Sequence, residues 1–363
     1  MRLQVTQENL NAALISVAKV ASSRSTLPIL SNILLRTKGT RLSIAATNLD
    51  IAITHYVGSK VSEEGSITVP ARLMQEFVSS LPTGVIDLEL DDTKLHIVTP
   101  QYTSTINGSP ADDFPVMPAI TKGKSLELEG PSFKKALQQV IFAASGDDTR
   151  PVLTGAYLYS RDGSLYLVAT DSYRLAEEVI GATKQEVDLL IPASALSELL
   201  RLIGEGEAKI KVTYDEQQAS FNIEDTELVT RLIEGKYPDY QKLIPKEFAI
   251  TASVNRNEMI NITKVSSLFS KESAGSIKLD ISEENQNLSI HSIASQLGEN
   301  TSAATAKVSG SGSITINSRY LLDALHALSG DAVDFCCNGK LEPALVKDPG
   351  QKNYTHIIMP LKS

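Results

Sequence analysis

The sequence predicts an α+β fold in which one two-layer unit, helices packed on an antiparallel sheet, is repeated three times along 363 residues. Three observations predict this fold. A strand–helix segment recurs at a nearly constant interval, a Pro-ended tripeptide recurs after it, and each copy begins with an amphipathic helix.

The recurring strand–helix segment is the firmest sign of repetition. Its copies start at positions 67, 189 and 314, which are 122 and 125 residues apart. Each has a short apolar run followed by a 3.6-residue apolar period, the pattern of a strand leading into an amphipathic helix. The segments read "ITVPARLMQEFVSSLP", "LLIPASALSELLRLIG" and "ITINSRYLLDALHALSG", and the tripeptides are "VMP" (116–118), "LIP" (243–245) and "IMP" (358–360).

A second helix is predicted at the head of each copy, over 6–21, 131–144 and 254–270. Each shows an apolar stripe at i, i+3, i+4 and i+7, so one face is expected in the core. The stripes are Leu10, Ala13, Leu14 and Val17; Phe133, Ala136, Leu137, Val140 and Ile141; and Ile262, Val265 and Phe269. Alternating runs at 41–53, 164–176 and 287–295 predict half-buried strands between the helices. We expect domains at 1–120, 121–248 and 249–363.

Three such units side by side predict an arc with helices on the inside and antiparallel sheets on the outside. The strands at the two ends of an arc are unpaired and favour pairing with another chain. Two chains joined head to tail would close a six-domain ring. Twelve helices of roughly 10 Å diameter give a circumference of about 120 Å and a free hole of about 28 Å, wide enough for a DNA duplex.

The charge distribution leaves two interpretations open. The net charge is −9, whereas the six predicted helical segments hold eight basic and five acidic residues, or +3. A basic lining inside an acidic shell would attract a polyanion to the hole. Ordinary solvated helix faces would show the same small excess. Arg24 and Arg150 each lie in the loop after an equivalent helix, which favours a role in the lining.

No catalytic, metal or cofactor motif is present in the sequence. It has no P-loop, Rossmann, HExxH or CxxC pattern, its five histidines are scattered, and its two cysteines are adjacent. We therefore expect no catalytic residue, no metal and no cofactor. Without a secretory segment or an apolar run of about 20 residues, we expect a cytoplasmic protein and no membrane partner. Two alternatives remain: an enzyme that uses the Asp pairs at 91–92, 112–113 and 147–148, and a repeat scaffold with no nucleic-acid role.

Six segments, in this order and at these distances, resemble the bacterial DNA polymerase III beta subunits, the replicative sliding clamps. They are "STLPILSNILL" (25–35), "ITVPARLM" (67–74), "ADDFPVMP" (111–118), "LVATDSYRLA" (167–176), "KYPDYQKLIP" (236–245) and "IIMPLKS" (357–363). The resemblance implies a DNA replication protein with three clamp-type domains per chain, a ring-shaped homodimer around double-stranded DNA. It implies a processivity factor without catalytic activity that an ATP-driven clamp loader places on DNA and that tethers the DNA polymerase III alpha subunit.

The resemblance also implies three sets of site residues. Partners with a clamp-binding motif, a Gln-led peptide with Leu and Phe, would dock in an apolar pocket between the second and third domains. That pocket would comprise Leu153, Thr170, Ser172, Tyr173, Arg174, Leu175, Pro238, Lys242, Leu243, Asn317, Tyr320, Leu341, Ile357, Ile358, Met359, Pro360 and Leu361. The DNA-facing residues would be Arg24, Arg72, Arg150, Arg201, Arg256 and Lys264, and the dimer interface Ser104, Ile106, Leu268 and Phe269. Ala193 and Ser194 replace basic residues common in the family, and Ser104 replaces an aromatic one.

Overall fold

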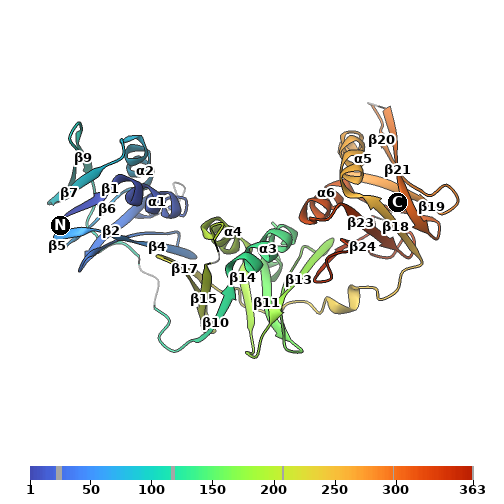
Figure 1. The fold of residues 1–363 in the computed structure, drawn as a ribbon, viewed down its shortest axis with the longest axis horizontal. Helices are drawn as coiled ribbons and strands as arrows, with labels where there is room; N and C mark the ends of the chain where they lie inside the picture. The colour runs from blue at the N-terminus through green and yellow to red at the C-terminus, as the bar shows by residue number, and fades with distance from the viewer. Residues whose placement is uncertain (22–26, 116–118, 207, 297, 362–363) are drawn as a thin grey trace. The chain divides into compact units, whose positions relative to one another are not determined.

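A computed structural model of the chain describes residues 1–21, 27–115, 119–206, 208–296 and 298–361 (Figure 1). These residues form two compact units. The first comprises residues 1–131 and 198–232, and the second comprises residues 132–197 and 233–363. Every ladder between the described strands is antiparallel, as the repeat pattern predicts.

The first unit contains two sheets with helices α1 (Gln7–Val17) and α2 (Ala71–Ser80). One sheet has the order β5-β1-β7-β8-β9, with β1 (Arg2–Thr6), β5 (Lys60–Glu63), β7 (Val85–Asp91), β8 (Lys94–Val98) and β9 (Thr103–Asn107). The other has the order β10-β15-β16-β17-β4-β3-β2-β6. Its strands are β2 (Asn32–Lys38), β3 (Arg41–Thr47), β4 (Ile51–Gly58), β6 (Ser66–Pro70), β10 (Lys124–Glu129), β15 (Lys209–Tyr214), β16 (Gln218–Ile223) and β17 (Thr226–Arg231).

The second unit is built on one sheet of the order β14-β11-β12-β13-β25-β24-β23-β18-β21-β20-β19-β22. Its strands are β11 (Gly155–Arg161), β12 (Ser164–Thr170), β13 (Arg174–Ala182), β14 (Asp188–Pro192), β18 (Ile250–Asn255), β19 (Ser276–Ser282), β20 (Asn287–Ala294), β21 (Gly298–Ser309), β22 (Gly312–Asn317), β23 (Ala332–Cys337), β24 (Ala344–Lys347) and β25 (Tyr354–Ile358). Helices α5 (Arg256–Phe269) and α6 (Ser318–Ala327) belong to it. Helices α3 (Gly130–Val140) and α4 (Ala193–Leu202) each span a boundary between the units.

The same strand pairing joins one repeat to the next in both units. In the first unit β17 pairs with β4, with Thr226 opposite His55. In the second unit β25 pairs with β13, with Ile358 opposite Arg174. In each case the last strand of one repeat extends the sheet of its neighbour, so the sheet, and not only the connecting chain, holds the repeats together.

The predicted apolar stripes are confirmed for the first two head helices, apart from the half-buried Ile141, and wrong for the third. In α5 the buried residues are Met259, Ile260, Thr263 and Ser266, whereas Val265 is 44% exposed. Thr263 Oγ1 donates to the Met259 carbonyl oxygen at 2.6 Å, and Ser266 Oγ donates to Asn300 Oδ1 at 3.1 Å. Because these hydroxyls are hydrogen-bonded, small polar residues can face the sheet. The apolar side chains of Val265 and Leu268 are left on the outer face.

Neither a metal cluster nor a membrane span is found in the part of the chain that the structure describes. No three His, Cys, Asp or Glu side chains gather there as a metal site requires. No helix in those ranges has the length and apolar character needed to cross a membrane. Cys336 and Cys337 are both buried in β23, as expected for small core residues.

Candidate partner-peptide pocket, DNA-facing residues and open sheet edges

The end of the chain is held in place by backbone hydrogen bonds on both sides. After the buried strand β25, the Met359 N–H donates to the Tyr173 carbonyl oxygen at 2.8 Å, and the Leu361 N–H donates to the Thr315 carbonyl oxygen at 2.8 Å. Met359, Pro360 and Leu361 are half-buried. Residues 354–361 therefore form a buried strand and, after it, a partly exposed segment fixed beside the turn that connects β12 to β13.

The turn at 171–174 is fixed by its own side chains. Thr170 Oγ1 accepts from the Ser172 N–H at 3.1 Å and donates to the Arg174 carbonyl oxygen at 2.6 Å. Asp171 Oδ1 accepts from the backbone N–H groups of Tyr173 and Arg174 at 2.8 and 2.9 Å. Ser172 has φ +78°, a left-handed conformation uncommon for a residue with a side chain. This geometry leaves the Tyr173 side chain 56% exposed.

Arg174 connects the turn to the third repeat through hydrogen bonds and ion pairs. Its guanidinium donates to Asp171 at 3.1 Å, to Asp323 of α6 at 2.5 Å and to the Phe142 carbonyl oxygen at 2.6 Å. The guanidinium carbon lies 4.6 Å from the centre of the Tyr320 ring. Arg174 is only 8% exposed, and the carboxylates of Asp171 and Asp323 balance its buried charge. These contacts fix the position of the turn.

A small cavity lies where the turn, the connecting segment and the chain end meet. It is lined by Thr170, Ser172, Arg174, Leu175, Leu243, Ile244, Ile357 and Met359. Its volume is about 20 Å³, room for about one water molecule. Leu243 is 51% exposed at its edge. The structure thus brings together seven of the predicted pocket residues, and it adds Ile244, the residue that follows Leu243 in "KLIP".

The other predicted pocket residues do not line this cavity. Leu153 and Ile358 are buried, Asn317 Oδ1 caps the start of α6, and Lys242 pairs with Asp239 at 2.8 Å. Leu341, in the turn between β23 and β24, is 76% exposed, and Pro238 is exposed as well. Tyr173, Tyr320, Pro360 and Leu361 lie in the segments that form the cavity or contact them.

Tyrosines anchor the connecting segment that carries Leu243. The Tyr240 hydroxyl donates to the Glu177 carboxylate and lies 2.6 Å from the Tyr159 hydroxyl. The Tyr237 ring stacks on Tyr157 with 5.1 Å between centroids. Burial raises the pKa of Glu177, and the hydrogen bond from Tyr240 opposes that rise. The segment is therefore tied to the outer sheet face by a buried hydrogen-bond network.

A second buried network lies under the β13–β25 pairing. Burial, helped by the charge of Arg174, lowers the pKa of His356 to about 3, so the imidazole is neutral. Burial raises the pKa of Glu178 to about 7, opposed by the Lys135 charge and a hydrogen bond from Gln351. The Tyr354 hydroxyl donates to the Gln139 carbonyl oxygen at 3.0 Å. These contacts fix the strand from which the pocket turn extends.

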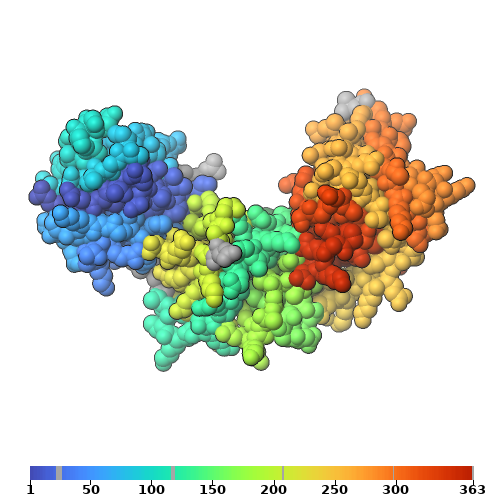
Figure 2. Space-filling view, in the orientation of Figure 1, coloured from blue at the N-terminus to red at the C-terminus, as the bar shows by residue number. Residues whose placement is uncertain are grey.

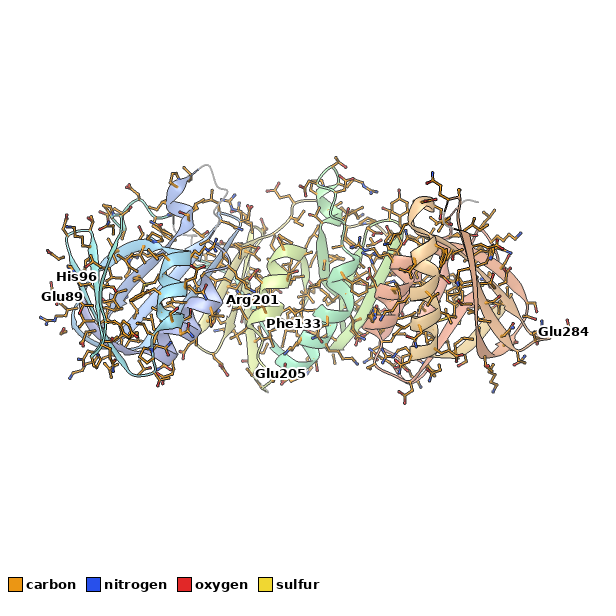
Figure 3. The ribbon with its side chains drawn as sticks, turned by 90° about the horizontal axis from the view of Figure 1, so that it is seen from above. Glu89, His96, Phe133, Arg201, Glu205 and Glu284 are labelled. Atoms are coloured by element: carbon orange, nitrogen blue, oxygen red, sulfur yellow. The ribbon has the colours of Figure 1, made fainter. Side chains whose placement is uncertain are left out.

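The predicted DNA-facing residues fall into two groups. Arg72, Arg150 and Lys264 are exposed. Arg201, labelled in Figure 3, is half-buried and donates to the Ile15 and Ser16 carbonyl oxygens of α1 at 3.1 and 2.6 Å.

Arg256 is likewise half-buried and donates to the Gly330 and Leu328 carbonyl oxygens beyond α6 at 2.7 and 3.0 Å. In both residues the guanidinium satisfies carbonyl oxygens at a helix end, which leaves less of it for a phosphate. Arg24 lies outside the described residues.

The predicted dimer residues lie on strand β9, which has no described strand on one side, and on helix α5. Strand β9, which carries Ser104 and Ile106, pairs only with β8. Ile106 is 5% exposed and packs in its own repeat, so the backbone edge is what β9 offers. On α5, Leu268 is 56% exposed, and Phe269 and Ile262 are half-buried. Figure 2 shows the α5 segment at the surface of the second unit.

Three family models match the chain one after another. They are described as the N-terminal, central and C-terminal domains of the DNA polymerase III beta subunit and match residues 1–118, 127–239 and 241–362. The beta sliding clamp of Synechococcus elongatus is 31% identical, with 100% of this chain and 99% of the relative covered. The sliding clamp from Bacillus subtilis has a TM-score of 0.94 at 26% identity, covering 100% and 99% of the two chains. The Pseudomonas aeruginosa clamp bound to griselimycin has a TM-score of 0.95 at 26% identity, covering 100% of both.

Proposed function

Since the chain is 31% identical to a beta sliding clamp over its full length, it belongs to the beta sliding clamp family of DNA polymerase III beta subunits, and we propose that two copies close a ring around double-stranded DNA. A beta sliding clamp is a processivity factor in DNA replication and a non-catalytic polymerase subunit. In the proposed assembly the clamp is held on DNA by topology and slides without reading sequence.

The observation that carries ring closure is a third strand pairing between repeats that the chain does not complete by itself. Two such pairings, called joints below, are made within the chain: β17 with β4, and β25 with β13. In the third repeat, the strand equivalent to β4 and β13 is β21. Its residues 298–305 pair with β20 on one side and have no described strand on the other, because β18 pairs only with residues 306–309. In the first repeat, the strand equivalent to β17 and β25 is β9, which has a described strand on one side only. By analogy with the register of the two existing joints, we expect Thr105 of one copy to lie opposite residues 299–300 of the second copy.

Helix contacts at the existing joints support the same pairing. Arg201 of α4 bonds to carbonyl oxygens of α1, and Gln139 of α3 donates to the Ala327 carbonyl oxygen of α6 at 2.7 Å. By the repeat, α5 would contact α2 of the second copy. The apolar stripe of Ile262, Val265, Leu268 and Phe269 on α5 would then cover Leu73 and Phe77, of which Leu73 is 51% exposed. Sequence reasoning missed Val265, Leu73 and Phe77 because it assigned the α5 stripe to the core and examined only the family positions.

Topological binding predicts a difference between DNA forms. The clamp, loaded by the clamp loader with ATP, should stay on a nicked circular plasmid and leave when that plasmid is linearised. A Leu268→Asp variant should be monomeric by light scattering and should not be retained on either form. Equal retention of the wild type on circular and linear DNA would reject the ring.

For the DNA surface we propose few and weak phosphate contacts, from Arg72, Arg150 and Lys264. Exposed cations contact phosphates without reading bases, and such contacts weaken as salt rises. Retention on circular DNA should nevertheless persist at salt concentrations that abolish direct binding to short linear duplexes. The overall charge of −9 would repel DNA from the outer surface.

For partner binding we propose that the cavity at the chain end receives a leucine of a Gln-Leu-x-Leu-Phe peptide. Such peptides would belong to the DNA polymerase III alpha subunit, the clamp loader and other clamp-binding-motif proteins. Apolar walls from Leu175, Leu243, Ile244 and Ile357 suit an aliphatic anchor. The cavity is too small for a leucine, so the flexible side chain of Met359 would have to move aside.

The pocket can be tested with residues that do not support the core. Leu243→Ala should weaken binding of a labelled Gln-Leu-Ser-Leu-Phe peptide about 30-fold, since truncating an interface anchor costs about 2 kcal/mol. Val85 is a matched control because it is also 51% exposed and lies on β7, outside all the sites above. Unchanged affinity in Leu243→Ala would move the peptide to another surface.

A further inference from the structure

One hydrogen bond connects a proposed DNA contact to the wall of the peptide pocket. Arg150 Nη1 donates to Ser172 Oγ at 2.9 Å. Arg150 follows the α3 loop and is exposed, and Ser172 lines the cavity from the 171–174 turn. Because both side chains are exposed, a DNA phosphate can reach the guanidinium and compete with the serine hydroxyl, and charged phosphate is the stronger acceptor.

The same turn holds the residue that closes the cavity. The carbonyl oxygen of Tyr173, next to Ser172, accepts the Met359 N–H at 2.8 Å, and Met359 lines the cavity. Arg150 is therefore connected to Met359 by two hydrogen bonds and by the backbone between Ser172 and the Tyr173 carbonyl group. With both hydrogen bonds made, the cavity measures about 20 Å³. In this structure, therefore, the Arg150–Ser172 hydrogen bond is made while the cavity is small.

We propose that Arg150 couples DNA occupancy to opening of the partner-peptide pocket. When a phosphate takes the Arg150 guanidinium, the Ser172 side chain, which lines the cavity, loses that partner and can rotate, while the hydrogen bonds of Thr170 and Asp171 keep the turn backbone in place. A peptide leucine then enters without breaking the Arg150–Ser172 hydrogen bond, so its binding costs less. This inference rests on the proposed function, since it needs both DNA at Arg150 and a peptide at the cavity.

The coupling has a fixed sign and must be reciprocal. DNA at Arg150 raises peptide affinity, and bound peptide raises DNA affinity by the same factor. The coupling comes from one exposed, charge-assisted hydrogen bond, so the expected effect is about two- to fivefold. Partners would then favour clamps already on DNA over free clamps.

Two variants remove the Arg150–Ser172 hydrogen bond in the absence of DNA. In fluorescence anisotropy with a labelled Gln-Leu-Ser-Leu-Phe peptide, Ser172→Ala should bind about two- to fivefold more tightly than wild type. Arg150→Gln should do the same, and the double variant should match the single ones, because both remove one interaction. Arg36→Gln and Ser62→Ala are matched controls, since both residues lie on other strands and contact no part of the pocket.

A DNA arm tests the coupling itself. Wild type loaded on nicked circular plasmid should bind the peptide about two- to fivefold more tightly than free wild type, whereas Ser172→Ala should bind equally in both states. If wild type binds DNA and peptide but with independent affinities, or if Ser172→Ala does not tighten binding, the coupling is overturned and the proposed function stands. If wild type does not bind the peptide at all, the proposed pocket fails, and the coupling fails with it.

Discussion

Glu178 should make the stability of the second unit fall as the pH rises from about 4.5 to about 7. The residue lies on β13 and is 6% exposed, and burial raises its pKa to about 7 from an ordinary value of 4.5. Lys135 of α3 lowers that pKa by its charge, and Gln351 lowers it by a hydrogen bond. Asp348 and Lys352 also line the polar cavity of about 650 Å³ beside it. The folded protein therefore favours the protonated carboxyl group.

The direction and size of the effect follow from the two pKa values. The folded state binds the proton more tightly than the unfolded state, so the stabilisation is complete below pH 4.5 and is lost as the pH rises to about 7. The full shift corresponds to about 3 kcal/mol at 1.36 kcal/mol per pKa unit, an upper limit. Because the cavity is open to water on one side, we expect about 1–2 kcal/mol.

A Glu178→Gln variant isolates this contribution. Urea unfolding of wild type and variant between pH 5 and 8.5 should show the variant gaining about 1–2 kcal/mol relative to wild type as the pH rises. Other titrating groups cancel in the difference. Glu284→Gln is the control for the same substitution at an exposed site (Figure 3). A wild-type-to-variant difference that stays constant across the range would refute the assignment.

Three further outcomes are expected from single changes. Leu268→Asp should convert the dimer to a monomer of unchanged circular dichroism, measured by light scattering at micromolar concentration, because it puts a charge into the apolar stripe. Arg201→Ala should lower the stability of the first unit by about 1–2 kcal/mol in urea unfolding, since it removes two donors from the end of α1; an unchanged midpoint would show that this contact contributes nothing. Deleting 359–363 should abolish peptide binding while the dimer persists, which the same light-scattering and anisotropy measurements would check.

The repeat and its helices could be predicted because they depend on local apolar spacing. The stripes of α1 and α3 lie in the core because their periodic residues include nearly all of the large apolar ones, the exception being the exposed Ile15 of α1. The prediction failed for α5, where periodicity cannot tell a face buried in the core from an outward face. Thr263 and Ser266 face the sheet because their hydroxyls find acceptors, and only the structure shows those partners.

The pocket was accessible to sequence reasoning only through the family resemblance. Its lining comes from segments around 170–175, 243–244 and 357–359, and no local pattern brings these together. Likewise, nothing in the sequence distinguishes Arg201 and Arg256, which cap helices, from the exposed Arg72. An arginine on a helix has the same pattern whether it reaches a phosphate or a neighbouring helix end.

The residues in and around the cavity divide into those buried in the β13–β25 pairing and those at its exposed edge. Arg174, Leu175 and Ile357 are buried in the β13–β25 pairing, so changing them disturbs the contact that joins two repeats. Leu243 and Tyr173 are more than half exposed and can change without loss of the core. In the proposed recognition site, the rigid walls would come from contacts that the fold already needs. Adaptation to different peptides would then depend on the exposed edge and on Met359, the one lining side chain that is both flexible and only half-buried.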